Sequence, residues 1–135
     1  MKQVLLFMWQ LPQNILGLLV ILFTSAFKTK DDRYWVAGKG GFGVSLGSFI
    51  IFGDMNGRYI PTEVSIMHEQ GHQKQSLYLG PFYLLLIGLP SILGNIWDRL
   101  FHREWSDDKR EKWYYSRYPE NWADKLGDVK RFKEE

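Results

Sequence analysis

Two long runs without a charged residue dominate the pattern of hydrophobic and polar positions along the chain. The first covers Val4 to Phe27 and the second covers Leu77 to Trp97. About 20 apolar residues of helix cross the hydrocarbon core of a bilayer, so runs of this length are typical of membrane-spanning helices. The pattern predicts a membrane-associated chain with an N-terminal transmembrane helix over residues 4–27.

The residues after the first run indicate how such a helix would be oriented. Its 24 residues correspond to about 36 Å of helix, enough to cross a bilayer core of about 30 Å. Lys28, Lys30 and Arg33 follow it, and basic residues flank membrane spans mainly on the cytoplasmic side. We therefore expect the N-terminus outside and the rest of the chain at the cytoplasmic face.

Polar residues interrupt the first run. Gln3, Gln10 and Asn14 are spaced to share one face of a helix, which indicates packing against protein or an interfacial position. Pro12 can kink the helix. A cleaved signal peptide that ends near Ala26 is an alternative interpretation of this segment.

The region between the two runs favours β-structure. Aromatic and β-branched residues at 34–36, a glycine-rich segment and an apolar run at 42–52 predict a β-hairpin or small sheet over residues 34–53. A turn over residues 54–57 follows. An edge of this sheet is suited to hold an extended peptide by strand addition. The expected fold class is α+β, a small and mainly helical membrane-associated domain.

The glycine-rich segment, residues 38–43, also matches the pattern G-x-G-x-x-G. A dinucleotide-binding loop with this pattern follows a strand and opens a helix. The residues that follow here favour a strand instead. We assign the segment to a turn and predict no nucleotide partner.

The segment M-H-E-Q-G-H, Met67 to His72, carries the clearest chemistry. His68 and His72 are four residues apart, so on a helix both imidazoles project from one face and can reach one metal ion. Glu69 lies beside them in the position of a general base. This is the HExxH pattern of zinc metallopeptidases.

Residues 62–79 have the sequence features of the helix that this motif requires. Thr62 is a suitable N-cap, Glu63 favours the first turn, and Gly80 with Pro81 ends or kinks the helix. Gly71 lies between the two histidines, although glycine costs about 1 kcal/mol against alanine inside a helix. Its position indicates close approach of a neighbouring strand or of substrate.

A catalytic zinc ion needs a third protein ligand and one open position. One extended motif, HExxHxxGxxH, takes that ligand from the same segment. This chain has Gln75 and Tyr78 where that motif has its glycine and its last histidine. A metzincin is therefore excluded.

A later segment offers acidic residues with helical spacing. Pro119 suits the first turn of a helix, and Gly127 suits a left-handed cap at its end. Glu120 and Asp124, four residues apart, would share one face of this helix.

Together, H-E-x-G-H and E-x-x-A-D resemble the motif pair of gluzincins, and especially that of the membrane-associated peptidases of the HtpX and CAAX prenyl protease type. The resemblance covers residues 61–76 and 119–127. It implies a minimal zincin-like core that binds Zn²⁺. The implied ligands are His68, His72 and Glu120, with Glu69 as general base and Asp124 orienting a ligating histidine through its second ring nitrogen.

These roles imply hydrolysis of peptide bonds. Zinc lowers the pKa of a bound water from about 15.7 to about 7, and Glu69 can accept the proton. The hydroxide attacks the carbonyl carbon, and Glu69 then delivers a proton to the leaving amine. The residues near the third ligand that could stabilise an oxyanion, none of which is favoured, are Tyr114, Tyr115, Arg117, Tyr118 and His102.

The metal site changes the interpretation of the second apolar run. His72 precedes this run and Glu120 follows it, so a single crossing would separate two ligands of one ion. Glycine and proline at residues 80–81 and 88–90 divide it into halves of about nine residues, each too short to cross. We expect re-entrant or interfacial helices over residues 80–97. The alternative is a buried core helix of a soluble domain.

Composition narrows the remaining choices. At 135 residues the chain is expected to form a single domain, residues 1–135. Its 17 basic and 15 acidic residues give a net charge of +2, and no nucleic-acid motif is present, so no nucleic-acid partner is expected. Because the chain has no cysteine, a metal must take nitrogen and oxygen ligands. Residues 98–135 form a charged, aromatic-rich tail that contains the E-x-x-A-D helix.

We therefore expect a membrane-associated zinc metalloendopeptidase with its zinc site at the cytoplasmic face. Its partners would be a lipid bilayer and a peptide or protein substrate, membrane proteins included. Two alternatives stay open. One is a non-catalytic zinc-binding membrane adaptor with the same ligands, and the other is a structural membrane protein that binds no zinc.

Overall fold

The computed structural model describes residues 1–38, 40–53 and 61–132. Within these ranges the chain is α+β, mainly helical with one small mixed sheet of four strands. Its α-helices are α1 (Lys2–Trp9), α2 (Leu11–Thr24), α3 (Glu63–Leu79), α4 (Leu89–Phe101), α5 (Asp107–Tyr115) and α6 (Glu120–Leu126). A 3-10 turn η1 (Gly80–Phe82) and a π-helical turn η2 (Leu84–Gly88) connect α3 to α4.

The sheet combines a hairpin with a parallel pair of strands. The strands, β1 (Phe27–Lys28), β2 (Trp35–Ala37), β3 (Gly43–Leu46) and β4 (Phe49–Gly53), lie in the order β1-β2-β4-β3. β3 and β4 form an antiparallel hairpin around Gly47, whose φ of +64° favours glycine. β2 pairs with β4 in parallel, so residues 34–53 form more than the simple hairpin. The turn expected over residues 54–57 lies outside the described residues.

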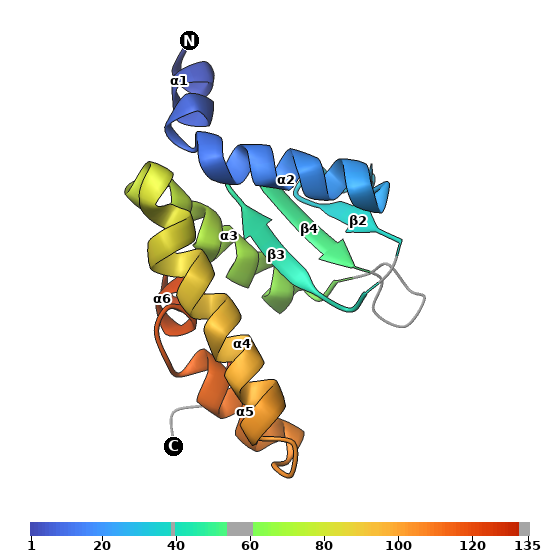
Figure 1. Ribbon diagram of the computed structural model, residues 1–135, viewed down its shortest axis with the longest axis vertical. Coiled ribbons are helices and arrows are strands. Elements are labelled where there is room, and N and C mark those ends of the chain that lie inside the picture. Colours follow the sequence, from blue (N-terminus) through green and yellow to red (C-terminus); the bar gives the residue numbers. More distant parts are fainter. Residues whose placement is uncertain (39, 54–60, 133–135) are drawn as a thin grey trace.

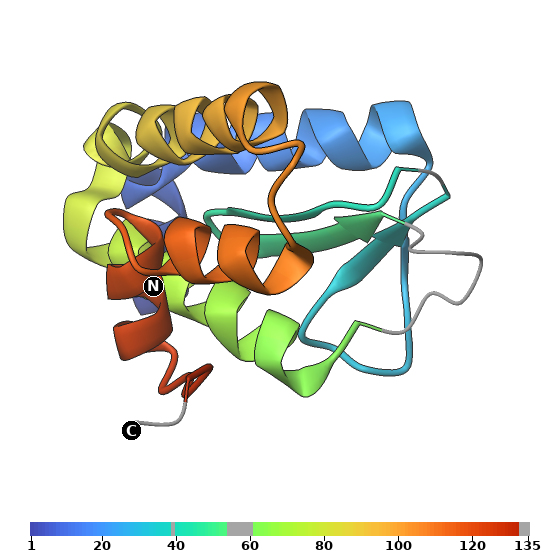
Figure 2. The same cartoon turned by 90° about the horizontal axis from the view of Figure 1, so that it is seen from below.

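β4 lies at the centre of the sheet because it is apolar on both faces. Ile50 and Phe52 pack against Ile66 of α3, and Ile51 packs against Ile21 of α2. The two helices therefore cover opposite faces of the sheet (Figure 1). α4 lies on the same side of the molecule as α2, whereas α3 lies on the opposite side (Figure 2). β3 remains at the edge of the sheet.

The N-terminal run is not the single helix expected over residues 4–27. It forms α1 and α2, which are bent by 85° relative to each other, and Phe27 already belongs to β1. Pro12 lies in the first turn of α2, where its missing N–H is tolerated, so the helix begins just before it. The ring of Trp9 at the end of α1 packs against Gly80, where a Cβ would lie 2.2 Å from it, and its indole N–H donates to the carbonyl of Leu77 at 2.9 Å.

Buried side-chain amides hold α2 against α3 and the β3–β4 turn. Gln13 Nε2 donates to Ser76 Oγ at 2.8 Å, and this hydroxyl donates to Gln10 Oε1 at 2.6 Å. Asn14 Oδ1 accepts from the backbone N–H of Ser48 at 2.7 Å. Gln10, Gln13 and Asn14 therefore pack against protein, one of the two positions that the sequence indicated. Gln3 is exposed, and the bend after Gln10 means that the predicted polar residues do not share one helix face.

The sequence predicted that glycine and proline at residues 88–90 divide the second apolar run. This prediction is wrong, because residues 84–101 form one continuous helical stretch. Pro90 has no N–H to donate to the carbonyl of Leu86, four residues earlier. The hydroxyl of Tyr118 donates to this carbonyl instead. The wider π-helical turn of η2 directly precedes the proline.

In the described part of the chain, the stretch Leu84–Phe101 is long and apolar enough to cross a membrane. The pair α1 and α2 meets the same criteria only if the two bent helices are counted as one span. These criteria concern length and composition alone, and a core helix of a soluble protein or a signal sequence also meets them. Membrane association is therefore taken up below as a proposal.

Glycine allows α3 and α6 to pack closely. A Cβ on Gly71 would lie 1.9 Å from the carbonyl oxygen of Ala123 in α6, and a Cβ on Gly127 would lie 2.1 Å from the carbonyl oxygen of Met67. The element that approaches Gly71 is therefore a helix, not the strand or substrate that the sequence indicated.

We expect Gly71→Ala to lower the free energy of unfolding by about 1–3 kcal/mol, as overpacking usually does. The added methyl group meets backbone, which cannot rotate away as a side chain can. Urea unfolding of the metal-free protein, followed by circular dichroism, measures the change.

Gly88→Ala is the matched control for this substitution. Its Cβ would meet only Leu84, at 3.6 Å or more, so the variant should keep or slightly raise its stability through helix propensity. Equal stability of the Gly71→Ala variant and the unsubstituted protein would contradict the close packing of α3 on α6.

Candidate metal centre

α3 presents both histidines of the motif to the interior. It begins after Thr62, whose hydroxyl accepts the backbone N–H of Ser65 at 3.2 Å, and it ends at Gly80, which has a positive φ of 54°. His68 and His72 are buried on the same face of this helix.

α6 presents Glu120 and Asp124, both buried, to the same place. Gly127 after this helix does not have the expected left-handed conformation, since its φ is -82°. Asp128 has it instead, with a φ of 57°. Gly127 lacks a side chain for a different reason, which is its contact with the backbone of α3.

The two histidines and Glu120 converge on one point. Nε2 of His68 and Nε2 of His72 each lie 3.0 Å from Oε2 of Glu120. In a tetrahedral zinc site, ligand atoms about 2.0–2.1 Å from the ion lie about 3.3 Å from one another. All three ligand atoms lie within 4.8 Å of one another, so the side chains could hold one metal ion.

The hydrogen bonds of the other ring nitrogens also fit a metal ion. Nδ1 of His68 donates to Oδ1 of Asp124 at 2.7 Å, and Nδ1 of His72 donates to Oε1 of Gln75 at 2.7 Å. A neutral imidazole with its proton on Nδ1 has a lone pair on Nε2. When both rings are neutral, both lone pairs face Oε2 of Glu120. Either a cation between the three atoms or a proton on one Nε2 stabilises this arrangement.

The pKa values of the ligands follow from these contacts. Burial alone would lower the pKa of His68, but its hydrogen bonds with Asp124 and Glu120 outweigh burial and raise the pKa to about 9. Burial would raise the pKa of Glu120, but its hydrogen bonds with His68 and His72 hold the pKa well below its usual range. Without a metal, the site therefore keeps a proton on His68 that a cation must displace.

Glu69 lies buried beside the histidines. Its Oε2 has no hydrogen-bond partner among the described residues. Burial raises the pKa of Glu69, while the charges of His72 and His68 oppose this rise. Gly43 of β3 leaves room for the carboxylate, because a Cβ there would lie 3.1 Å from Glu69 Oε1. Such a carboxylate is suited to accept a proton in the cavity next to it.

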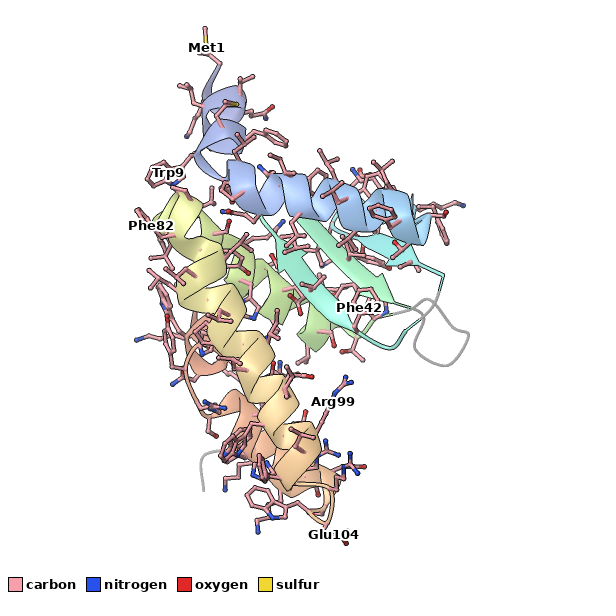
Figure 3. The ribbon with its side chains drawn as sticks, in the orientation of Figure 1. Met1, Trp9, Phe42, Phe82, Arg99 and Glu104 are labelled. Carbon is pink, nitrogen blue, oxygen red and sulfur yellow. The ribbon has the colours of Figure 1, made fainter. Side chains whose placement is uncertain are left out.

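A cavity of about 650 Å³ adjoins the centre, and His68, Glu69, His72 and Glu120 all line it. Its walls come from α3, from β3 and from η2 with α4. Phe42 and Arg99 also line it and extend from opposite walls toward the same gap (Figure 3). The large apolar side chains that line it include Leu16, Leu46, Tyr83, Ile87, Ile92 and Ile96.

Residues that the sequence analysis did not assign to the site hold its ligands in place. The hydroxyls of Ser91 and Tyr114 both donate to Oε1 of Glu120. Arg131 Nε donates to Oδ2 of Asp124 at 2.7 Å. Ser91 carries a weak sequence signal as a polar residue within an apolar run, and Gln75 carries another through its helical spacing from a histidine. Arg131 carries none, because it follows the last helix.

Of the five residues that the sequence offered as donors to an oxyanion, two line the cavity and three make other contacts. Tyr114 and Tyr115 line the cavity. Burial and the charge of Glu120 raise the pKa of Tyr114, which keeps its hydroxyl protonated and able to donate. The other three have different contacts: Arg117 stacks on Trp113, Tyr118 donates to the backbone of Leu86, and His102 hydrogen-bonds with Asp98.

Comparison with protein-family models, with curated proteins and with solved structures found no significant match to this chain. The likeness to gluzincins stays a prediction from two short motifs. The geometry of the site is therefore the main basis for a functional proposal.

We expect the zinc affinity of the protein to rise about tenfold per pH unit from about pH 6 and to level off near pH 9. The ion must replace the proton on His68, whose pKa is raised to about 9, so protons compete with zinc below this pH and no longer do so above it. Competition with a chelator of known affinity, repeated across this range, measures the dependence.

Asp124→Asn should shift the plateau to lower pH, because it removes a hydrogen bond that raises the pKa of His68. Asp98→Asn is the matched control, since Asp98 makes the equivalent contact with His102 instead. A zinc affinity that does not vary with pH would contradict the protonation of His68.

Proposed function

We propose that the protein is a membrane-associated, zinc-dependent metalloendopeptidase of the gluzincin type. The observation that carries this proposal is the convergence of His68, His72 and Glu120 beside a buried Glu69 on the wall of a cavity. Nitrogen and oxygen ligands in this combination suit zinc. The substrate is a peptide or protein.

The surroundings of the ligands favour a catalytic site over a structural one. A structural zinc site has four protein ligands, whereas a catalytic site has three and an open position. Within the described residues, the group able to hold an ion has three members, and all three line the cavity. Glu69 adds a carboxylate whose Oε2 has no hydrogen bond to another described side chain or backbone group.

The residues of the chain then have distinct tasks in peptide hydrolysis. When bound, zinc supplies Lewis acidity that polarises a carbonyl oxygen and makes water nucleophilic near neutral pH. Glu69 accepts a proton from the attacking water and gives one to the amine nitrogen as the C–N bond breaks. Asp124 and Gln75 hold the histidine rings in orientation through their Nδ1 atoms.

The position of β3 supports an extended peptide as substrate. β3 is an edge strand, and all four of its residues line the cavity. An edge strand has free backbone groups that can pair with an added strand. The outward carbonyl of Ser45 already accepts the hydroxyl of Tyr83 at 2.9 Å, so an added strand would pair with the other outward backbone groups of β3, such as those of Gly43.

We expect Glu69→Gln to retain one zinc ion per chain and to lose hydrolysis by about 10²–10⁴-fold, the usual contribution of a general base. Zinc is measured by elemental analysis of the purified protein, and hydrolysis with a mixture of quenched fluorescent peptides. Full hydrolysis by this variant would overturn the role of Glu69 as general base. Zinc retained by the unsubstituted protein without any hydrolysis would sink the peptidase proposal and favour the non-catalytic zinc adaptor.

Glu63→Gln is the matched control, since Glu63 lies on the same helix but pairs with Arg33 on the surface. It should retain both zinc and activity. If neither variant nor the unsubstituted protein retains zinc, the metal centre itself is refuted.

The arrangement of the apolar helices supports a position in the plane of a membrane surface. α2 and the stretch 84–101 lie on the same side of the molecule (Figure 2), and each leaves one apolar face exposed. Their opposite faces bind the domain, for example through Asn14 in α2 and through Ser91 in α4. Trp9 and Trp97 add exposed indoles, which are enriched at membrane interfaces.

A bilayer leaflet is the partner that this surface fits. Helices held along their length by a folded domain are suited to lie in the interface, with their apolar faces among the acyl chains. Leu16 and Ile92 line the cavity and come from these two helices, so the metal centre would open near the membrane surface. Lys28 and Lys30, which follow α2, favour the cytoplasmic leaflet.

We expect the protein to float with phosphatidylcholine–phosphatidylglycerol vesicles in a density gradient. Leu22→Glu and Leu93→Glu, placed on the exposed faces of α2 and α4, should each weaken binding about tenfold or more, because each replaces an apolar side chain of the proposed membrane contact with a charged one. Lys125→Glu, on the helix α6, is the control for added negative charge.

Binding that is equal in all variants would contradict this surface as the membrane contact. Self-association of the protein in place of flotation would assign the same surface to a second copy of the chain. Zinc content, measured in each variant, reports whether the fold is intact.

A further inference from the structure

Arg131 is a cation next to the candidate metal centre, and 9% of its side chain is exposed. Its Nε donates to Oδ2 of Asp124 at 2.7 Å, and its guanidinium carbon lies 3.5 Å from the ring centroid of Tyr115. Its Nη1 lies 3.8 Å from Oε1 of Glu111. Its Nη2 is buried without a hydrogen-bond partner in the part of the chain that the structure describes.

Two of these neighbours, Asp124 and Tyr115, also contact His68. Oδ1 of Asp124 accepts from Nδ1 of His68 at 2.7 Å, so the two oxygens of this carboxylate are divided between the histidine and Arg131. The ring of Tyr115 meets the ring of His68 edge to face, with 5.1 Å between centroids. Arg131 thus contacts two of the groups that fix the plane of one ligand.

The chain after α6 is shaped to bring Arg131 back to this place. Asp128 has a left-handed φ of 57°, and the backbone N–H of Val129 donates to the carbonyl of Asp124 at 2.8 Å. These contacts fold the chain onto the end of its own helix. The side chain of Arg131 can therefore reach the carboxylate that lies seven residues earlier.

We propose that Arg131 is a positioning residue of the candidate metal centre, which orients His68 through Asp124 and Tyr115. This inference rests on the metal centre of the proposed function. It does not depend on whether the bound ion catalyses hydrolysis. Arg131 touches neither the ligand atoms nor the general base, so it acts through its neighbours.

Zinc affinity of purified variants tests the proposal, with the metal alone as the probe. Arg131→Gln should weaken zinc binding about 10–100-fold, as loss of a group that orients a ligand usually does. Arg131→Lys should fall between this variant and the unsubstituted protein, because lysine keeps the charge but lacks the planar guanidinium. Arg117→Gln is the matched control, since Arg117 stacks on Trp113 at 4.5 Å and should leave affinity unchanged.

A double-mutant cycle separates this role from a general effect on stability. If Arg131 acts through Asp124, then Arg131→Gln should change zinc affinity less than threefold in an Asp124→Asn background. An undiminished effect in that background would overturn the proposed route. The visible spectrum of the Co²⁺-loaded protein should change in Arg131→Gln and stay unchanged in Arg117→Gln, because it reports ligand geometry.

The outcomes also distinguish this inference from the proposed function. Zinc binding that Arg131→Gln leaves within twofold overturns the role of Arg131 but leaves the metal centre intact. If the unsubstituted protein binds no zinc, the proposed function and this inference fail together. If Arg131→Gln does not fold, Arg131→Lys provides the comparison.

Discussion

The close packing of α3 against α6 is the contact on which the rest of the site depends. Gly71 and Gly127 have no side chain at this contact, and the backbones of the two helices meet there. A helix with a larger residue at either place would hold Glu120 farther from the histidines. Because ligand atoms must lie within a few ångström of one ion, the candidate metal centre depends on this separation of the two helices.

Hydrogen bonds then fix the orientation of the side chains that the two helices bring together. Each histidine has one nitrogen held by a side-chain oxygen and the other nitrogen aimed at Glu120. Ser91 and Tyr114 hold the second oxygen of Glu120, which ties α4 and α5 to the same carboxylate. Several elements therefore share one buried network, and loss of one member leaves others without partners.

The apolar helices α2 and α4 each pack against the domain with one face and leave the other face exposed. α2 uses a buried polar face against α3 and the sheet, while its other face remains apolar and exposed. In α4, the interior face carries Ser91 beside the metal centre and Asp98 paired with Arg110. A purely hydrophobic helix could not make these contacts, and a purely polar one would not leave an apolar surface on one side of the molecule.

Local periodicity alone indicated that His68 and His72, and likewise Glu120 and Asp124, share one helix face, because neighbours four apart along a helix always do. Capping by Thr62 and the end of α3 at Gly80 are also local properties of the chain. Pro12 also indicated a kink in the first apolar run. The parallel pairing of β2 with β4 and the continuity of α4 through Pro90 needed the tertiary structure. Each depends on partners distant in sequence, such as Tyr118 for the carbonyl that Pro90 leaves free. Arg131 belongs to the same group, since only the fold of the chain after α6 returns it to Asp124.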